Sequence, residues 1–141
     1  MVGDAMRNAR IILADDHTLL LEAFRKMLEP EFEVVGAVAD GNALVRISAQ
    51  LKPDVCIIDI SMPYLNGIEA AIKLRENGSE ARIVFLTVNE DSDFVRAALK
   101  TGALGYVVKS RMASDLCAAI KGAISGHLFV SPSCIFSADP D

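Results

Sequence analysis

The sequence predicts an α/β fold, a doubly wound five-stranded parallel sheet with helices on both faces. Two observations indicate this class. Five short apolar runs alternate with five segments of helical periodicity, in units of about 20 to 25 residues, and units of that length suit strands joined by right-handed helical crossovers. Four of the five runs also end directly in polar residues, which is typical of strands that open onto a functional edge.

The expected strands are rich in apolar and β-branched residues, as buried parallel strands are. They lie at 10–14, 34–39, 55–58, 82–86 and 105–108. The expected helices each carry apolar residues on one face at a spacing of three or four. They lie at about 18–28, 41–51, 68–76 and 91–100, and a last helix is capped by Ser114 or Asp115 and ends before Gly126.

Residues that favour helix ends mark several of these boundaries. Thr18 is a suitable N-cap for the first helix, and Pro30 lies just beyond its end. Asp40 opens the second helix. Gly78 and Gly102 follow the third and fourth helices, where a glycine commonly ends the helical backbone.

Length and composition indicate one domain without a membrane segment. The chain has 141 residues and a hydrophobic content of 52%, enough for a single core. Residues 10–126 are expected to form the domain, residues 1–9 to fray, and residues 127–141 to begin a linker or tail. No apolar run reaches the roughly 18 residues of a membrane span, and the first ten residues lack the apolar core of a secretory signal. We therefore expect a cytoplasmic protein.

Charge and cysteine usage exclude some other classes. The net charge of −5 provides no basic surface, so this chain alone is not expected to bind DNA. Its three cysteines show no paired spacing, which argues against a disulfide framework or a zinc site. Cys56 is expected in the core. His17 and His127 are expected on the surface, because no cysteine or second histidine supports a metal site beside them.

The polar residues that follow the strands form one candidate site. Asp15 and Asp16 follow the first strand, Asp59 the third, Thr87 the fourth and Lys109 the fifth. The carboxyl ends of parallel strands lie along one edge, so these side chains can meet there. Clustered carboxylates repel one another, and a hard cation with oxygen ligands, Mg²⁺, keeps them ionised. A lysine and a hydroxyl beside them suit phosphoryl transfer, which leads to the hypothesis that Asp59 becomes phosphorylated.

With these residues, the chain resembles the receiver domain of two-component response regulators from about Arg10 to Gly126. The matching positions are Asp15-Asp16, Asp59, Met62-Pro63, Gly67, Thr87, Tyr106 and Lys109. The resemblance implies a flavodoxin-like fold with strand order 2-1-3-4-5. It also implies that the chain is no turnover enzyme, and that Asp59 takes a phosphoryl group from the phosphohistidine of a sensor histidine kinase.

The resemblance further implies the ligands of Mg²⁺. They are the side chains of Asp16 and Asp59 and the backbone carbonyl of Ser61, while Asp15 acts through water.

It also implies a switch. Lys109 and Thr87 are expected to hold phosphoryl oxygens, and Thr87 moving inward leaves space into which Tyr106 rotates. The surface of the fourth helix, fifth strand and fifth helix then changes. From the residues alone, a tyrosine within a strand is ordinarily a packing residue, and that alternative for Tyr106 stays open.

Two segments resemble the NarL/FixJ/LuxR-type branch, whose receivers precede a helix-turn-helix: Asp15-Asp16-His17 and residues 126–132. The implied output is a separate LuxR-type domain that binds DNA, and homodimerisation on phosphorylation is common in the family. We expect the segment after Gly126 to be the start of a linker from an excised receiver. The alternative is a stand-alone or degenerate receiver that serves as a docking module.

Two positions depart from the usual receiver pattern. Lys109 is followed by Ser110, where many receivers have a proline after a cis bond, so we expect a trans bond here. Ser61 and Asn89 occupy the positions that tune dephosphorylation in the family. Neither is a strong acid or base, so the sequence predicts no phosphoryl lifetime.

Two rival functions fit less well. A phosphatase of the haloacid dehalogenase type uses Asp-x-Asp, whereas this chain has Asp59-Ile60-Ser61. A flavin module needs a hydroxyl-rich phosphate loop after the first strand, where the acidic pair of this chain would repel a phosphate.

Overall fold

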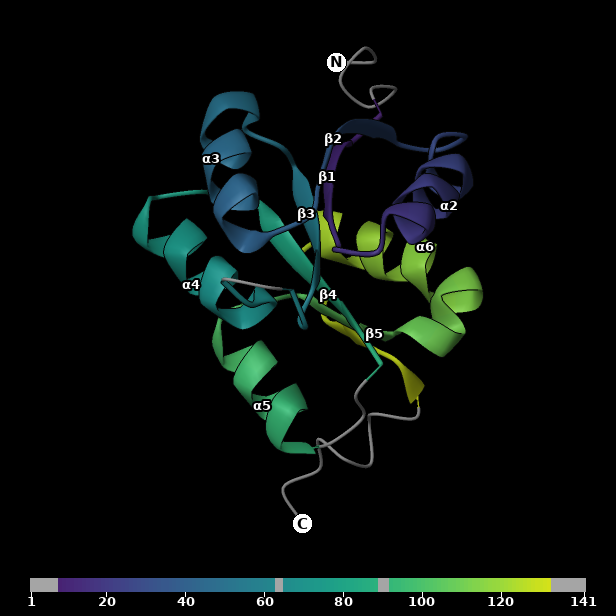
Figure 1. The fold of residues 1–141 in the computed structure, drawn as a ribbon. Helices are drawn as coiled ribbons and strands as arrows, with labels where there is room; N and C mark the ends of the chain where they lie inside the picture. The colour runs from purple at the N-terminus through teal and green to yellow at the C-terminus, as the bar shows by residue number, and fades with distance from the viewer. Residues whose placement is uncertain (1–7, 63–64, 89–91, 133–141) are drawn as a thin grey trace.

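Six parallel strands form one sheet in the order β2-β1-β3-β4-β5-β6 (Figure 1). The computed structural model describes residues 8–62, 65–88 and 92–132. The strands are β1 (Arg10–Ala14), β2 (Glu33–Val38), β3 (Val55–Asp59), β4 (Arg82–Thr87), β5 (Gly105–Val108) and β6 (Phe129–Val130). The predicted order 2-1-3-4-5 is confirmed. The sixth strand was not predicted, and it adds a short parallel edge beside β5.

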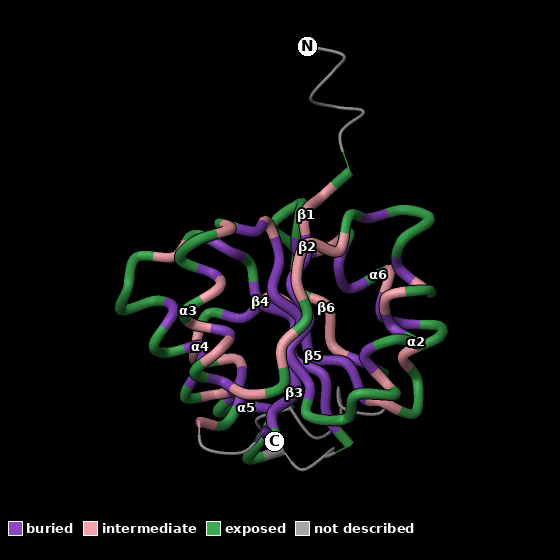
Figure 2. Tube along the Cα trace, turned by 45° about the horizontal axis from the view of Figure 1, so that its top comes forward, coloured by how far each residue is buried: buried purple, intermediate pink, exposed green. Residues whose placement is uncertain are grey.

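In the described part of the chain, five α-helices cover the two faces of the sheet, as predicted. They are α2 (Thr18–Leu28), α3 (Gly41–Leu51), α4 (Gly67–Glu76), α5 (Ser92–Lys100) and α6 (Met112–Ile124), and a short 3-10 helix, η1 (Lys109–Arg111), precedes α6. Helices α3, α4 and α5 lie on one face, and α2 and α6 lie on the other (Figures 1 and 2). This arrangement makes three layers with the sheet in the middle.

Alternation along the strands divides the apolar core into two halves. Ile12 and Ile58 pack with the residues of α3, α4 and α5, whereas Ile11 and Ile57 pack with those of α2 and α6. Every residue of β3 is buried, and Figure 2 shows the central strands enclosed between more exposed helices. Each large apolar side chain buried in this way contributes about 1.5 to 3 kcal/mol. The two half-cores therefore fix the strands, and with them the strand ends.

Three helix starts show how local hydrogen bonds set the boundaries. Asp40, which was expected at the opening of this helix, is the N-cap of α3, and its side chain accepts a hydrogen bond from the Ala43 N–H at 2.8 Å. Asn66 caps α4 in a reciprocal capping box with Glu69. At α2 the prediction was wrong by one residue. His17, not Thr18, is the N-cap, because the Asp15 carboxylate accepts the His17 N–H at 2.9 Å and turns the chain there.

The start of the last helix was also predicted wrongly. Helix α6 begins at Met112 rather than at Ser114 or Asp115. The 3-10 turn η1 runs directly into it, and the Ser114 hydroxyl donates back to the Arg111 carbonyl at 3.1 Å. Both expected capping residues therefore lie inside the first turn.

Some predictions concern residues outside the described ranges. The residues outside these ranges include Pro63, Asn89 and Asp91. They also include residues 1–7 of the N-terminus that was expected to fray and residues 133–141 of the expected tail. Among the described helices, none is long and apolar enough to cross a membrane.

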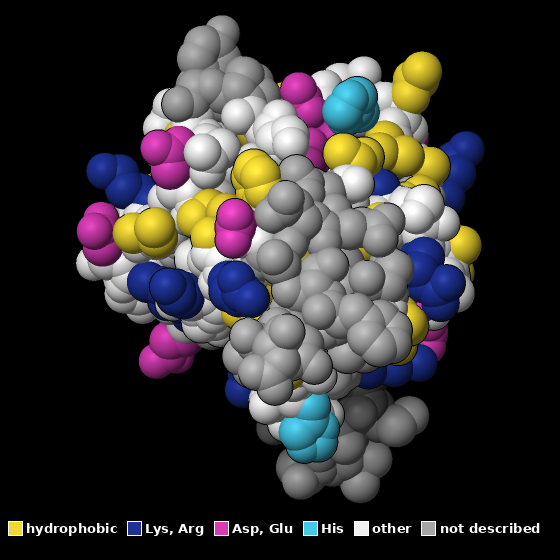
Figure 3. Space-filling view, turned by 90° about the horizontal axis from the view of Figure 1, so that it is seen from below, with side chains coloured by type: hydrophobic (Ala, Val, Ile, Leu, Met, Phe, Trp, Pro, Cys, Tyr) yellow, Lys and Arg dark blue, Asp and Glu magenta, His cyan; other side chains and the backbone are white. Residues whose placement is uncertain are grey.

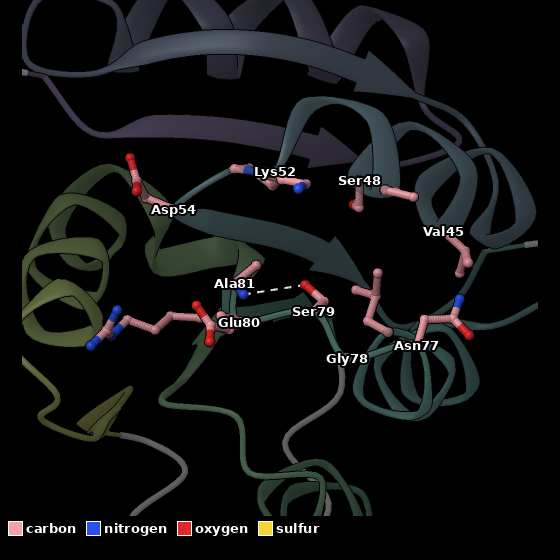
Figure 4. Close-up of a pocket in the computed structure, with 13 residues that line it drawn as sticks. Val45, Ser48, Lys52, Asp54, Asn77, Gly78, Ser79, Glu80 and Ala81 are labelled. Atoms are coloured by element: carbon pink, nitrogen blue, oxygen red, sulfur yellow. Dashed lines mark hydrogen bonds between the residues drawn. The ribbon is translucent and has the colours of Figure 1, made fainter.

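A pocket of about 560 Å³ lies at the edge of the sheet where β3 and β4 begin (Figure 4). It is lined by residues 52–54, which precede β3, by residues 77–82, which end at the first residue of β4, and by residues of α3 such as Ser48. The predicted site residues follow the other ends of the strands. This pocket is therefore separate from them.

Gly67, the first residue of α4, packs directly against the end of β3. A Cβ atom at this position would lie 2.5 Å from the Asp59 carbonyl oxygen and 2.7 Å from the Ile60 Cα. The Gly67 N–H also donates to the Ile60 carbonyl at 2.8 Å. No side chain fits here unless the backbone around Asp59 moves.

We expect Gly67→Ala to lower the free energy of unfolding by about 1 to 3 kcal/mol, because the added methyl group overpacks backbone atoms. Gly36→Ala is the control, since its nearest neighbour is the flexible end of Ile47 at 3.1 Å, and its effect should stay within about 1 kcal/mol. Urea denaturation of both variants measures the difference. Equal losses in the two variants would contradict this account of Gly67.

Candidate functional site

Polar side chains collect at the carboxyl edge of the sheet because four parallel strands end in register. Ala14 pairs with Ile58, Asp59 with Leu86, and Thr87 with Val108. Asp15 follows β1, Asp59 and Thr87 are the last residues of β3 and β4, and Lys109 follows β5. The prediction that these residues share one edge is confirmed.

A buried ion pair occupies the centre of this edge. The Lys109 Nζ lies 2.9 Å from the Asp15 Oδ2 and 3.4 Å from the Asp59 Oδ2. The side chains of both aspartates are 2% exposed, and that of Lys109 is 12% exposed. Two carboxylates and one ammonium therefore meet where little water screens them, and their interaction is strong at this depth.

The two carboxylates have buried oxygens that lack hydrogen bonds. The Asp59 Oδ1 accepts the Ser61 N–H at 3.1 Å. The Oδ2 atoms of Asp15 and Asp59 are buried, and within the described part of the chain they form the ion pair with Lys109 but no geometrically satisfactory hydrogen bond. Buried acceptors of this kind are costly unless another group satisfies them.

The pKa of Asp59 is raised above its ordinary value. Burial is the largest cause, and the nearby Asp15 carboxylate acts in the same direction. The Ser61 N–H and the Lys109 ammonium lower the pKa, but they do not fully compensate. An added cation would favour the ionised, nucleophilic form of Asp59.

The donor set suits a divalent cation. Asp15, Asp16, His17 and Asp59 each offer a ligand atom, and these atoms lie within 4.8 Å of one another. The carboxylates of Asp15, Asp16 and Asp59 form an acidic cluster of the oxygen ligands that Mg²⁺ prefers, and the two buried oxygens without hydrogen bonds fit a metal ion. For Ser61 the structure shows the N–H on Asp59, so the role of its carbonyl remains a prediction.

His17 is part of this cluster, which the sequence did not predict. Its side chain is 65% exposed, as expected, but the ring Nδ1 lies 2.9 Å from the Asp15 Oδ1 and 3.4 Å from the Asp16 Oδ1. Figure 3, which views the molecule from below, shows acidic, basic and hydrophobic side chains interspersed on this face. The position of His17 directly after the acidic pair was the available signal.

Thr87 and Tyr106 lie on neighbouring strands near the cluster. Thr87 pairs with Val108, and Tyr106 pairs with Phe85, so the side chains of Thr87 and Tyr106 lie on the same face of the sheet. Thr87 is 1% exposed and Tyr106 is fully buried, in the half-core under α3, α4 and α5. The packing position of Tyr106 is thus clear, and its switch role remains a prediction. The expected trans bond after Lys109 is confirmed, since no described peptide bond is cis.

We expect Asp59→Asn to raise the free energy of unfolding at pH 7 in metal-free buffer. Because the pKa of Asp59 is raised by folding, the folded state binds this proton more tightly than the unfolded chain, and wild-type stability falls as the pH rises above the ordinary pKa of an aspartate. Asparagine does not ionise, so its advantage should shrink as the pH is lowered through this window.

Urea denaturation from pH 4 to pH 8 measures this difference. Asp93→Asn is the control, because the Asp93 side chain is 89% exposed. A difference between Asp59→Asn and wild type that stays constant across the pH range would contradict the raised pKa.

Known proteins share both the fold and the sequence pattern. The family described as response regulator receiver domain matches residues 11–121. The transcriptional regulatory protein DegU of Brevibacillus brevis is 37% identical over 125 residues, which cover 87% of this chain and 53% of DegU. The nitrate/nitrite response regulator protein NarL of Escherichia coli K12 is 35% identical over 125 residues, which cover 87% of this chain and 58% of NarL.

A crystal structure of a LuxR-family two-component response regulator from Aurantimonas sp. SI85-9A1 superposes with a TM-score of 0.89. It is 34% identical, and the match covers 93% of this chain and 95% of that one. The chain spans less than two thirds of the length of the two curated relatives. With residues 11–121 matched and the acidic cluster at the expected strand ends, the chain belongs to the response regulator receiver domain family and is similar to its NarL/LuxR-type members.

Proposed function

We propose that the chain is a phosphoryl-accepting switch in which Asp59 takes a phosphoryl group from a sensor histidine kinase. Membership of the receiver family implies a cognate kinase, and the family consists of signalling domains rather than turnover enzymes. The observation that carries the proposal is the Lys109 ammonium between the buried carboxylates of Asp15 and Asp59.

The transfer is a displacement at phosphorus. A carboxylate oxygen of Asp59 forms a bond to phosphorus while the bond from phosphorus to the imidazole nitrogen of the donor breaks, so the product is an acyl phosphate. Lys109 lies beside the Asp59 Oδ2, where its ammonium can neutralise charge on the transferred oxygens. The buried Thr87 hydroxyl at the next strand end can donate to a second oxygen.

The cofactor that we propose is Mg²⁺. The side chains of Asp16 and Asp59 and the carbonyl of Ser61 would hold it, with Asp15 acting through water. When bound, the ion supplies positive charge against the carboxylates and the phosphoryl oxygens. All of these ligands are oxygen atoms, and two of the carboxylates have a buried oxygen without a hydrogen bond.

The proposed response to phosphorylation passes through Thr87 and Tyr106. Because their side chains share one face of the sheet, a shift of Thr87 toward the phosphoryl group would open space for Tyr106 to rotate. The surface of α5, β5 and α6 then changes.

The output that we propose is transcriptional control through a separate LuxR-type DNA-binding domain, with homodimerisation on phosphorylation, in the cytoplasm. The curated relatives are named as regulators, and they are longer than this chain. A receiver that acts only as a docking module is the alternative, and it would not need to accept phosphate.

Incubation with acetyl phosphate and Mg²⁺ should add one phosphoryl group per chain, measured by intact mass. Asp59→Asn should add none, because the acceptor oxygen is replaced by an amide nitrogen, whereas Asp93→Asn should react like wild type. Unreactive wild-type protein would favour the docking module. Labelling that survives in Asp59→Asn would rule out Asp59 as the acceptor and place it at another residue.

Lys109→Ala should still accept some phosphate but should transmit the change poorly, because the cation that links β5 to the acceptor is gone. Amide chemical shifts of α5, β5 and α6, recorded with and without beryllofluoride, report transmission. Lys100→Ala is the control, since Lys100 is exposed on α5. Shift changes in Lys109→Ala as large as those of wild type would argue against this role.

A further inference from the structure

The segment that follows α6 is hydrogen-bonded to the edge of β5 that faces away from β4. The Phe129 N–H donates to the Leu104 carbonyl at 2.8 Å, and the Ser131 N–H donates to the Tyr106 carbonyl at 2.9 Å. Figure 1 shows β6 lying beside β5 at the edge of the sheet. The proposed switch residue Tyr106 therefore shares its strand edge with the chain that leaves α6.

After these two backbone hydrogen bonds, the next bond to β5 is made by the Ser131 side chain. The Val108 N–H donates to the Ser131 Oγ at 3.1 Å, and the Ser131 hydroxyl donates to the Asp115 Oδ2 at 2.9 Å. Ser131 is fully buried, so water cannot replace either bond. The last N–H of β5, one residue before Lys109, is thus held by a hydroxyl from the segment after β6.

Asp115 fixes the direction of the Ser131 hydroxyl. Its carboxylate also accepts from the Arg111 Nε at 3.0 Å and from the Ser114 hydroxyl at 3.1 Å. Burial raises the pKa of Asp115, but the hydrogen bonds from Arg111, Ser131 and Ser114 together outweigh it, so the pKa lies below its usual range. An ionised Asp115 only accepts, so the Ser131 hydroxyl must donate to it and offers its lone pairs to Val108.

We propose that Ser131 and Asp115 are positioning residues that hold the end of β5, and with it Lys109, and so couple the acceptor site to the chain that leaves the receiver. The proposal rests on the proposed function, because it concerns the same lysine. Neither residue touches the acceptor. Ser131 is connected to Lys109 through the Val108 N–H, which it accepts, and through the peptide bond between Val108 and Lys109.

The coupling must be reciprocal, since linkage between two sites acts equally in both directions. If phosphorylation draws Lys109 toward the acceptor, the pairing of Val108 with Ser131 changes, and the segment after β6 responds. Conversely, loss of the Ser131 hydroxyl leaves the end of β5 less well placed and weakens binding of a phosphoryl group. The effect on Mg²⁺ should be small, because the carboxylate ligands lie on β3 and after β1.

Beryllofluoride binding in the presence of Mg²⁺, followed by calorimetry, tests the coupling in the full chain. Ser131→Ala should bind beryllofluoride about 10-fold more weakly, within the range of ordinary coupling between sites, with unchanged affinity for Mg²⁺ alone. Ser131→Thr keeps the hydroxyl and should bind within about 3-fold of wild type. Ser48→Ala is the control, because it removes another buried hydroxyl, one that contacts Cys56 and lines the pocket at the opposite ends of the strands. It should leave the affinity for beryllofluoride unchanged.

Hydrogen exchange provides the reverse measurement. Beryllofluoride should change the protection of the amides of Val108 and Ser131 in wild type but not in Ser131→Ala. If Ser131→Ala does not fold, Asp115→Ala replaces it, because it leaves the Ser131 hydroxyl in place but removes the acceptor that directs it, and it should still weaken beryllofluoride binding.

The outcomes separate this inference from the proposed function. Wild-type protein that does not bind beryllofluoride overturns the proposed function, and this inference with it. Wild type that binds, together with a folded Ser131→Ala or Asp115→Ala of equal affinity, overturns the positioning role alone.

Discussion

The structure depends on keeping two buried carboxylates next to each other at the ends of β1 and β3. Asp15 and Asp59 are both almost fully buried, and the Lys109 ammonium is the cation shown between them. This arrangement depends on Lys109, since loss of its ammonium would leave two negative charges uncompensated in a poorly solvated place. The sheet supplies this constraint, because three parallel strands in register bring the three residues to one point.

The elements around the acceptor are built to hold its backbone. Gly67 allows the first turn of α4 to rest on the Asp59 carbonyl, and the capping box of Asn66 and Glu69 fixes where that turn begins. Meanwhile Asp59 keeps an oxygen without a hydrogen bond and a raised pKa. The stability of the apolar half-cores thus offsets the cost of burying these carboxylates, as is common at functional sites.

The sequence predicted the parts of this architecture that have a repeating or local signal. Apolar runs followed at once by Asp15, Asp59 or Lys109 indicated both the strands and their shared edge, and Asp40 marked a helix start. The two-residue strand β6 has no periodicity of its own, and Ser131 is a key residue only because folding brings it beside Val108 and Asp115. His17 and the start of α6 were missed for a related reason, as both depend on hydrogen bonds between neighbouring turns.

The most direct test of the account is chemical mapping of the acceptor. Protein treated with acetyl phosphate and Mg²⁺ is reduced with borohydride, which converts an aspartyl phosphate into homoserine with loss of phosphate, and the peptides are then sequenced by mass spectrometry. We expect homoserine at position 59, dependent on Mg²⁺ and absent from protein that was not treated with acetyl phosphate. Homoserine at another aspartate, or at none, would contradict it.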